Sequence, residues 1–307
     1  MGIPSFFSHI LRNNKEVFVN FNKNVRWLML DSNSIIYDVV HSIKDEEITF
    51  FQIYQLVCER IQMYMDMFDE NTKVYISFDG VVPQAKMEQQ RQRRFRSALE
   101  KKLLPKKTVF DTLQITPGTK FMDGLDDYVE SFFGKNKRVL LSGSKVPGEG
   151  EHKICEYIRT HSLTNSKICI YGLDADLIVL SLNHMEYVDN IYLCRELPEE
   201  LGKYKNVTYD DTRVFMDMKK YQRIIESYMC DYKSNSNINL KNKVKDYIFL
   251  SFLLGNDFLP HFPWLNIRTN GIKTLLMAYK STIKPCESII KNGKIIWKNV
   301  KLLLKYL

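Results

Sequence analysis

The sequence predicts an α/β fold in which a mostly parallel central sheet is flanked by helices. Short apolar runs of strand length alternate with longer amphipathic runs along the first 180 residues. A helical run separates successive strands, and this order favours right-handed crossovers between parallel strands. Several of the apolar runs end in an acidic residue. In a parallel sheet these acids would gather at one edge, where open α/β folds bind their ligands.

The first two thirds of the chain contain the clearest elements. Apolar runs predict strands over residues 25–30, 74–78, 138–142 and 167–171. Helical spacing of apolar residues predicts helices over residues 3–12, 35–41, 50–68, 123–133 and 151–162 and after residue 176. A basic helix is expected to end before Pro105. Pro4 lies near the first turn of the first helix, with Ser5 as its expected cap.

The last third of the chain is less regular. Residues 190–194 predict an edge strand, and residues 213–229 and 241–254 predict helices. The second of these helices ends at Gly255, a residue type that commonly ends helices, and Asp257 follows in a turn. From Lys280 onward the chain is rich in lysine, isoleucine and leucine, which predicts a basic amphipathic helix.

The distribution of charge is more informative than the net charge of +8. Residues 86–107 hold nine lysines and arginines against two glutamates, and residues 280–305 hold seven lysines against one glutamate. An acidic middle is therefore flanked by basic segments. This distribution is typical of a nuclease, which needs carboxylates for metal ions and cations for a polyanionic substrate. A basic surface that binds any polyanion weakly would show the same distribution.

Composition also restricts the cellular compartment. The sequence is 45% hydrophobic, enough for a sizeable core, and its six cysteines form no CxxC pair and no disulfide framework. No signal sequence opens the chain, and no apolar run approaches the ~20 residues needed to span a bilayer. We therefore expect a soluble protein with reduced thiols that acts inside the cell, in the cytoplasm or the nucleus, without a membrane.

The stretch from residue 76 to residue 96 combines a strand end with a basic helix. The strand ends at Asp79, and Gly80 and Pro83 turn the chain before the helix begins. At 100° per residue, four donors share about one quadrant of this helix: Lys86, Gln90, Arg93 and Arg94. Donors grouped beside a metal-binding carboxylate predict a phosphate-binding face. A solvated basic helix after an aspartate that caps a turn would give the same pattern.

Seven acids follow apolar runs or stand in turns that contain glycine: Asp31, Asp79, Glu149, Glu151, Asp174, Asp176 and Asp257. Any one of them alone is more typical of a turn or a helix cap. Gathered in one crevice they would repel one another strongly, so they require cations. Two Mg²⁺ ions about 3.5–4 Å apart, for which Mn²⁺ can substitute, would supply these cations and favour phosphodiester hydrolysis. The cysteines and histidines lack the spacing of a zinc site, and no nucleotide-binding glycine motif is present.

A series of motifs resembles the Xrn-type 5′→3′ exoribonucleases. In chain order the motifs are Gly2-Ile-Pro-Ser-Phe-Phe, Leu30-Asp-x-Asn33, Phe78-Asp-Gly-Val-x-Pro-x-Ala-Lys-Met-x-Gln-Gln-Arg-x-Arg-Arg-Phe95, Pro117-Gly-Thr119, Val146-Pro-Gly-Glu-Gly-Glu-His-Lys153, Tyr171-Gly-Leu-Asp-Ala-Asp-Leu177 and Gly255-Asn-Asp-Phe-Leu-Pro-His261. Motifs of this length in this order are highly specific, and the match runs from residue 2 to about residue 275. The resemblance implies a nuclease domain of the PIN/FEN-like superfamily over residues 1–280, followed by a basic helical tail at residues 281–307.

The resemblance also implies an activity. The family degrades single-stranded RNA that carries a 5′ monophosphate, in RNA decay, and releases nucleoside 5′-monophosphates with Mg²⁺. By their match to the family motifs, the seven acids are its metal ligands and catalytic residues. The four donors of the basic helix match the family's pocket for the 5′ monophosphate, and Lys86 also matches a contact to the scissile phosphate. Such a pocket admits one phosphate and excludes a triphosphate or a cap.

The sequence departs from the family pattern at two points. Where the family has a histidine that stacks on the 5′ base, this sequence has Tyr37, which can stack in the same way or serve as a core residue. The chain stops soon after Asp257, so we expect no counterpart of the family's second conserved region. A compact viral or parasite relative, acting in the host cytoplasm if viral, or a shortened chain would both give this pattern.

Two other functions remain open on the sequence alone. One is a flap-type, structure-specific DNA nuclease of the same superfamily, which the donor pattern from Lys86 to Arg94 and the motif around Asp257 disfavour. The other is a non-catalytic RNA-binding remnant, which the presence of all seven acids disfavours.

Overall fold

The computed structural model describes residues 2–20, 24–43, 47–103, 110–198, 212–230 and 239–307. The chain forms two compact units. The sheet unit consists of residues 21–172 and 187–194, and the helical unit consists of residues 1–20, 173–186 and 195–307. The helical unit therefore contains the first twenty residues of the chain together with its last third.

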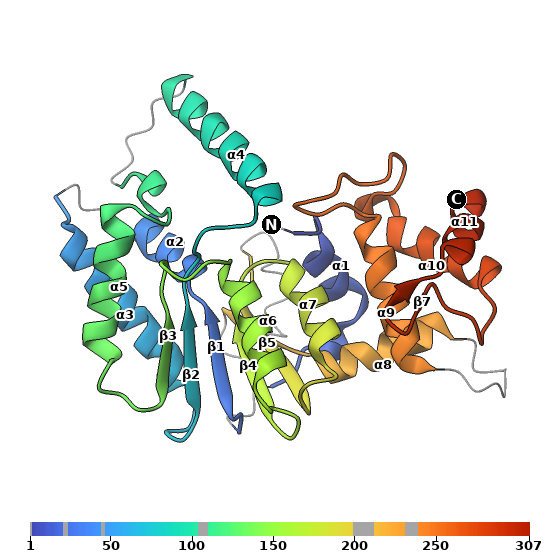
Figure 1. Ribbon diagram of the computed structural model, residues 1–307, viewed down its shortest axis with the longest axis horizontal. Coiled ribbons are helices and arrows are strands. Elements are labelled where there is room, and N and C mark those ends of the chain that lie inside the picture. The colour runs from blue at the N-terminus through green and yellow to red at the C-terminus, as the bar shows by residue number, and fades with distance from the viewer. Residues whose placement is uncertain (1, 21–23, 44–46, 104–109, 199–211, 231–238) are drawn as a thin grey trace. The chain divides into compact units, whose positions relative to one another are not determined.

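The sheet is built on a central strand, β1 (Trp27–Asp31), which has a parallel neighbour on each side. The strand order is β3-β2-β1-β4-β5-β6, and Figure 1 shows β3, β2 and β1 side by side. The strand pairs from β3 to β5 are all parallel, which confirms the predicted mostly parallel α/β sheet. The neighbours of β1 are β2 (Lys73–Ser77) and β4 (Lys167–Tyr171); β3 (Val139–Ser142) pairs with β2, and β5 (Asn190–Glu196) pairs with β4.

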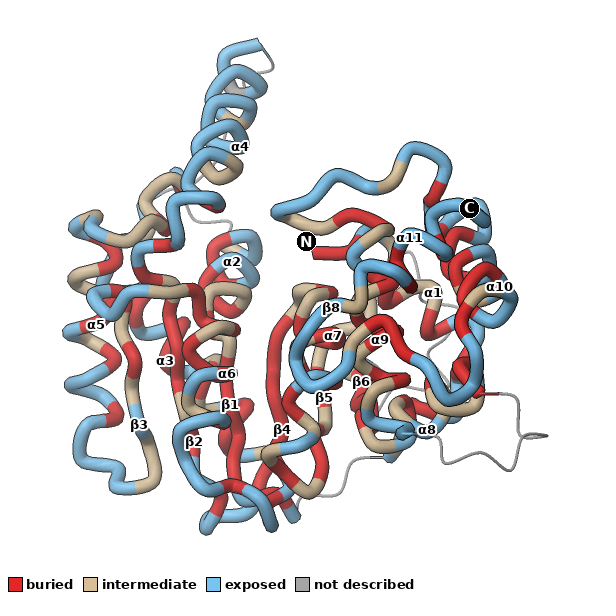
Figure 2. The backbone as a smooth tube through the Cα atoms, turned by 45° about the vertical axis from the view of Figure 1, so that its right-hand side comes forward, coloured by how far each residue is buried: buried red, intermediate tan, exposed pale blue. Residues whose placement is uncertain are grey.

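The central strands are buried because they are apolar on both faces. Leu28, Met29 and Leu30 of β1 and Val74 and Ile76 of β2 are almost completely inaccessible to solvent. Continuous apolar strands of this kind are typical of parallel sheets that are covered on both faces. Figure 2 shows the buried interior of these strands.

The helices of the sheet unit differ in how much of their surface they bury. The helix α3 packs against α2 and α5, and α6 packs against β1 and β2. The basic helix α4 instead projects away from the strands, as Figure 1 shows, and most of its surface is exposed in Figure 2. The elements are α2 (Asn33–Ser42), α3 (Phe50–Asp66), α4 (Gln84–Leu103), a short 3₁₀ turn (Thr112–Gln114), α5 (Lys120–Phe133) and α6 (Gly150–Thr160).

The helical unit contains a buried polar network around Asp246. The Asp246 carboxylate accepts hydrogen bonds from the Tyr279 hydroxyl at 2.5 Å and from the backbone N–H groups of Ile289 and Ile290 at 2.8 and 2.7 Å. The elements are α1 (Phe6–Asn13), α7 (Asp176–His184), β6 (Arg213–Asp217), α8 (Met218–Met229), α9 (Leu240–Phe252), α10 (Gly271–Thr282), β7 (Ile290–Lys291), β8 (Lys294–Ile295) and α11 (Trp297–Tyr306), with 3₁₀ turns at Lys15–Val17 and Ile267–Thr269.

Residues 213–229 form a strand and a helix, so the prediction of a single helix is wrong. Asp217 separates the two elements, because its carboxylate accepts a hydrogen bond from the backbone N–H of Lys220 at 3.1 Å and caps α8. The residues before this cap remain extended as β6. The predicted edge strand at residues 190–194 is also wrong in its position, since β5 lies between β4 and β6 in the strand order.

Two further details differ from the sequence expectations. Ser5 makes no side-chain cap on α1; its φ is +63°, and its hydroxyl oxygen accepts a hydrogen bond from Arg268 Nε at 3.0 Å. The basic region after residue 280 is not one helix. Asn292 and Gly293 both adopt positive φ, as a tight hairpin turn requires, and so a hairpin separates α10 from α11.

Among the described helices, none combines the length and the apolar character needed to cross a membrane.

Candidate active site

The site begins where two neighbouring strands of the sheet unit end. Asp31 is the last residue of β1 and is paired in register with Ser77, the last residue of β2. Asp79 follows Ser77 by two residues. Because the two strands are parallel and adjacent, both carboxylates lie at the same edge of the sheet, as the sequence predicts.

The backbone at Gly150 brings two more acids to this edge. The Gly150 N–H donates a hydrogen bond to Asp79 Oδ1 at 2.7 Å. A Cβ atom placed on Gly150 would lie 2.5 Å from Asp31 Oδ1, so the absence of a side chain lets the Asp31 carboxylate approach. Glu149 and Glu151 flank this glycine at the start of α6, and each is only 6% exposed. Four of the seven predicted acids therefore gather around one peptide unit.

The two loops that carry these acids are joined to each other. The Gly80 N–H donates to the Gly148 carbonyl, and the Gly148 N–H donates to the Val81 carbonyl, both at 2.8 Å. A Cβ atom on Gly80 would lie only 1.9 Å from the Val146 carbonyl oxygen, so no other residue fits there without movement of the loop. Gly80 is thus required by the close approach of these two loops.

Asn33 is a site residue that the sequence reasoning missed. Its Nδ2 donates to Asp79 Oδ2 at 2.9 Å, and its Oδ1 accepts from the Asp79 backbone N–H at the same distance. The two hydrogen bonds orient the Asp79 carboxylate toward the other acids. The available signal was the position of Asn33 two residues after Asp31 within a family motif, but that position alone assigns it no partner.

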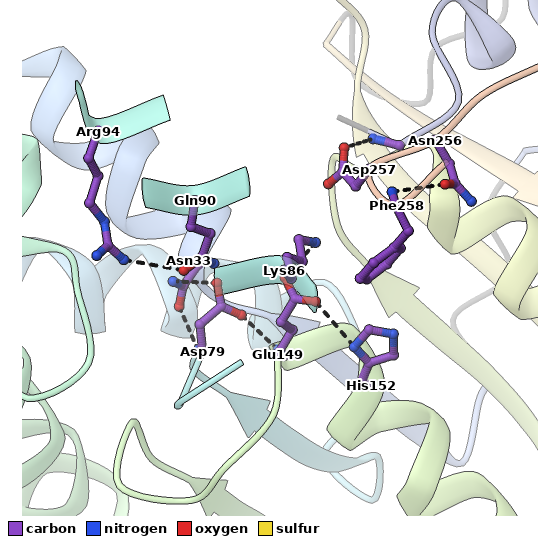
Figure 3. Close-up of polar contacts among 12 residues, drawn as sticks. Asn33, Asp79, Lys86, Gln90, Arg94, Glu149, His152, Asn256, Asp257 and Phe258 are labelled. Atoms are coloured by element: carbon purple, nitrogen blue, oxygen red, sulfur yellow. Dashed lines mark hydrogen bonds and ion pairs between the residues drawn. The ribbon is translucent and has the colours of Figure 1, made fainter. Parts of the chain in front are cut away.

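Lys86 is buried against one of the acids. Its Nζ lies 2.6 Å from Glu149 Oε1, and both residues are at most 6% exposed. On the other side of the carboxylate, His152 Nδ1 lies 3.3 Å from Glu149 Oε2. Figure 3 shows Glu149 beside Lys86 and His152. The basic helix therefore begins in direct contact with the acidic group, through the lysine that the sequence assigns to the phosphate pocket.

The acids differ in how easily they ionise. Burial raises the pKa of Asp79 to about 6; the Gly150 N–H opposes this shift, and the negative charge of Glu149 adds to it. Burial alone would also raise the pKa of Glu149, but the contacts with His152 and Lys86 outweigh it and hold that pKa below its ordinary value. The hydrogen bond to Glu149 raises the pKa of His152 in turn. Glu149 is therefore the more readily ionised of the two, and a bound cation would further favour the ionised form of Asp79.

The group of donors fits a divalent metal. Ligand atoms of Glu149, Glu151 and His152 all lie within 4.8 Å of one another. Carboxylate oxygens dominate the set, and Mg²⁺ and Mn²⁺ prefer such oxygen ligands, while one imidazole is also compatible with Mn²⁺. Asp79 adds a further carboxylate. Burial raises its pKa, and a bound metal ion would lower that pKa again. His152 was not among the predicted ligands, and its spacing from the other histidines gave no reason to choose it.

The exposed face of α4 carries the other predicted phosphate donors. Gln90 Oε1 accepts a hydrogen bond from Arg94 Nη2 at 3.2 Å, and Figure 3 shows both side chains pointing toward Asn33 and Asp79. The Arg93 and Arg94 side chains are exposed and hence accessible to a ligand. The structure thus places all four donors in the sheet unit, with Lys86 buried at the start of the row.

Tyr37 is close enough to Asp79, Arg93 and Arg94 to interact with their charges, and it is 39% exposed. Partial burial and the charge of Asp79 raise the pKa of its phenol, while Arg93 and Arg94 act in the opposite direction. Its ring stacks on that of His41, with centroids 6.3 Å apart. Tyr37 is therefore neither a buried core residue nor isolated from the site.

The other three predicted acids belong to the helical unit. Asp176, the first residue of α7, accepts a hydrogen bond on Oδ1 from the Ile3 N–H at 3.1 Å, and Asp257 Oδ1 lies 3.4 Å from the Gly2 nitrogen. Gly2 has a φ of +67°, and a Cβ atom there would lie 2.4 Å from Asp176 Oδ1. Asp174 is half-buried in the turn before α7. The contacts of Gly2 were not anticipated from the sequence, which offered only its place in the first motif.

Comparisons with known proteins agree with the motifs. A family described as "XRN 5'-3' exonuclease N-terminus" matches residues 1–197, and a second, "Xrn1 helical domain", matches residues 237–307. The second match extends beyond residue 275, where the motif resemblance ends. Among curated relatives, the "5'-3' exoribonuclease 2" of Arabidopsis thaliana is 33% identical over 91% of this chain and 34% of its own length. The "5'-3' exoribonuclease 1" of Saccharomyces cerevisiae is 30% identical over the whole chain and 22% of its own length.

Solved structures support the fold. The catalytic core of Rad2 in complex with a DNA substrate matches 90% of this chain and 67% of its own, with a TM-score of 0.52 and 16% sequence identity. The present chain thus shares the fold of that catalytic core. It spans about a fifth to a third of the length of the two curated relatives. From the family matches over most of its residues, the chain belongs to the Xrn 5′–3′ exonuclease family.

Proposed function

We propose that this chain hydrolyses 5′-monophosphorylated, single-stranded RNA in the 5′→3′ direction and releases nucleoside 5′-monophosphates. The observation that carries the proposal is the grouping of four carboxylates around Gly150, with a buried lysine of the basic helix in contact with one of them. Carboxylates that hold divalent cations, placed directly beside phosphate donors, are what phosphodiester hydrolysis requires. The names of the relatives indicate RNA as the polymer and the 5′ end as the starting point.

Two Mg²⁺ ions, or Mn²⁺ in their place, would stabilise the attacking hydroxide and the leaving oxygen of the phosphodiester when bound. In the sheet unit their proposed ligands are Asp31, Asp79, Glu149 and Glu151. In the helical unit they are Asp174, Asp176 and Asp257, which are supported by the family motifs that they match. Asn33 holds the Asp79 carboxylate in its orientation, and Glu149 stays ionised through its contacts with Lys86 and His152.

The basic helix would select the 5′ end of the RNA. Arg93 and Arg94 present exposed guanidinium groups, which bind phosphate oxygens in pairs, and Gln90 is held beside Arg94 by a hydrogen bond. Lys86 would contact the phosphate from the base of the row, next to the acids. Tyr37, whose ring is accessible beside these residues, would stack on the first base; such stacking contributes about 1–3 kcal/mol per base.

The test compares RNAs with different 5′ ends, and RNA with DNA, on one nucleotide sequence. A single-stranded RNA carrying a 5′-hydroxyl, a 5′-monophosphate or a 5′-triphosphate is digested with Mg²⁺, with Mn²⁺ and with EDTA, beside a 5′-monophosphorylated DNA of the same sequence and a DNA flap. We expect rapid release of mononucleotides from the monophosphorylated RNA with either metal and none with EDTA. Preferred cleavage of the flap would show a structure-specific DNA nuclease instead. Binding of the RNA without cleavage under any metal condition would show a non-catalytic RNA-binding protein.

A further inference from the structure

A second buried lysine lies at the start of α6, two residues after Glu151. Lys153 is 4% exposed, and its Nζ donates hydrogen bonds to two backbone carbonyls, that of Phe78 at 2.7 Å and that of Gly143 at 2.9 Å. Asp79 and Asp126 contribute favourable electrostatic interactions to its ammonium group. The ammonium group is thus held in place by peptide oxygens, an arrangement that fixes backbone segments.

The two carbonyls belong to segments that carry the acids. Phe78 immediately precedes Asp79, and Gly143 begins the loop of residues 143–149, which ends at Glu149. Lys153 itself lies on the helix that carries Glu151, and its own N–H donates to the Glu149 carbonyl at 3.0 Å. One side chain therefore joins the three segments from which Asp79, Glu149 and Glu151 emerge.

The start of the 143–149 loop is also held by a residue of α5. The buried Asp126 of α5 accepts hydrogen bonds from the Ser144 N–H, at 3.0 and 2.8 Å to its two oxygens, and from the Ser144 hydroxyl at 2.8 Å. The carbonyl of Gly143 is thus bound by Lys153, and the next N–H along the chain is bound by Asp126. Both hydrogen-bonding groups of this peptide unit are fixed, and so the loop begins at a defined place.

We propose that Lys153 is a positioning residue that sets the spacing of the Asp79, Glu149 and Glu151 carboxylates for a divalent cation. This inference rests on the proposed function, because it assumes that these carboxylates bind metal. Lys153 does not touch the cation or the RNA; it acts through the two peptides that it binds. When a group that orients metal ligands without touching the metal is removed, the affinity for metal typically falls about 10–100-fold.

The helical unit contains a matched control. Lys243 is 2% exposed, and its Nζ donates to the Tyr279 hydroxyl and to the Glu287 carbonyl, both at 2.8 Å. It is therefore a buried lysine with two oxygen acceptors, like Lys153, but none of these partners is a predicted site residue. Replacement of Lys243 should reduce the thermal stability of the protein without changing the affinity for metal.

The experiment measures Mn²⁺ binding to the 307-residue protein by titration calorimetry in the absence of RNA, for the wild type and for K153M, K153R and K243M. Thermal unfolding of each variant is followed by circular dichroism. We expect K153M to bind Mn²⁺ at least about tenfold more weakly than the wild type and K243M to bind it as tightly as the wild type. The Mn²⁺ affinity of K153R should lie between those of the wild type and K153M. On monophosphorylated RNA, K153M should lower kcat more than it raises KM.

The outcomes separate the inference from the function on which it rests. A folded K153M that binds Mn²⁺ as tightly as the wild type overturns the positioning role and leaves the proposed function intact. A K243M variant that loses the same affinity shows that general destabilisation is the cause, which also overturns it. If K153M does not fold, K153R decides: wild-type affinity overturns the inference, and measurably weaker binding supports it. A wild type that binds no Mn²⁺ overturns the proposed metal site and this inference together.

Discussion

Lys86 and Glu149 form a buried ion pair, with 2.6 Å between Nζ and Oε1, which joins the first turn of the basic helix to the acidic group. A buried pair of this kind makes each partner dependent on the other, because a single charge left in the interior lacks solvation. The pair therefore links the segment proposed to bind the phosphate with the segment proposed to bind the metal.

Replacing Lys86 with methionine should destabilise the protein, because Glu149 would lose the nearer of the two cationic partners, Lys86 and His152, that it has among the described residues. Removal of one partner of a buried pair typically costs about 3–5 kcal/mol. The free energy of unfolding is measured by urea titration, and Mg²⁺ should restore part of the loss. Lys102, exposed on the same helix, is the control, and K102M should change stability little. Equal stabilities of K86M and K102M would show that the pair contributes nothing.

Arg93→Ala and Arg94→Ala should each reduce the preference for 5′-monophosphate over 5′-hydroxyl RNA. Each variant loses a charge-assisted contact to the phosphate, and such contacts contribute about 1.5–3 kcal/mol. The measurement is the ratio of kcat/KM for the two RNA ends. Arg96, exposed on α4 outside the quadrant of the four donors, is the control. If R96A changes the ratio as much as R93A and R94A do, the helix attracts RNA without selecting its end.

Asn33→Ala should weaken metal-dependent hydrolysis, because Asp79 would lose both of its hydrogen bonds with Asn33 and keep the one from the Gly150 N–H. We expect the Mg²⁺ concentration for half-maximal rate to rise about 10–100-fold, as is typical when a hydrogen-bond partner of a metal ligand is removed. Ser34→Ala is the control, since the Ser34 hydroxyl donates only to the Asp31 carbonyl. An unchanged Mg²⁺ requirement in N33A would mean that the Asp79 carboxylate needs no orientation from Asn33.

Gly150→Ala should abolish activity without unfolding the protein. The added methyl group would lie 2.5 Å from Asp31 Oδ1, so the carboxylate must move away from the other acids. Rate and circular dichroism are measured together. Gly118→Ala is the control for backbone strain: Gly118 has a φ of +84°, but a Cβ atom there would meet nothing within 4 Å. G118A should therefore lose some stability and keep its activity. An active G150A would show that Asp31 can move without consequence.

The grouping of the acids in the sheet unit was predictable because it follows from topology. Apolar runs that end in Asp31 and Asp79, separated by a helical run, imply parallel neighbouring strands whose ends coincide. The glycines on either side of Glu149 likewise imply close backbone contacts. These inferences need only the order of the elements and the residue types at their ends.

Contacts that depend on side-chain direction could not be predicted in the same way. The pairing of Asn33 with Asp79 joins residues 46 positions apart, and the hydrogen bond from Lys153 to the Phe78 carbonyl joins residues 75 positions apart. The loops between them follow a course that the sequence does not specify. The strand β6 was missed for a different reason. Its five residues run directly into α8, and only the cap by Asp217 marks the boundary between them.

The pairing of the first residues of the chain has a consequence for folding during synthesis. Phe18 forms an antiparallel bridge with Met216, and the Val19 N–H donates to the Phe215 carbonyl at 3.0 Å. Phe18 and Val19 must therefore wait until about two hundred further residues have been translated before their partners exist. During that interval the helical unit cannot complete its core, because its other residues lie at positions 173–186 and 195–307. Contacts of such long sequence separation slow folding and lengthen the exposure of apolar segments to other chains.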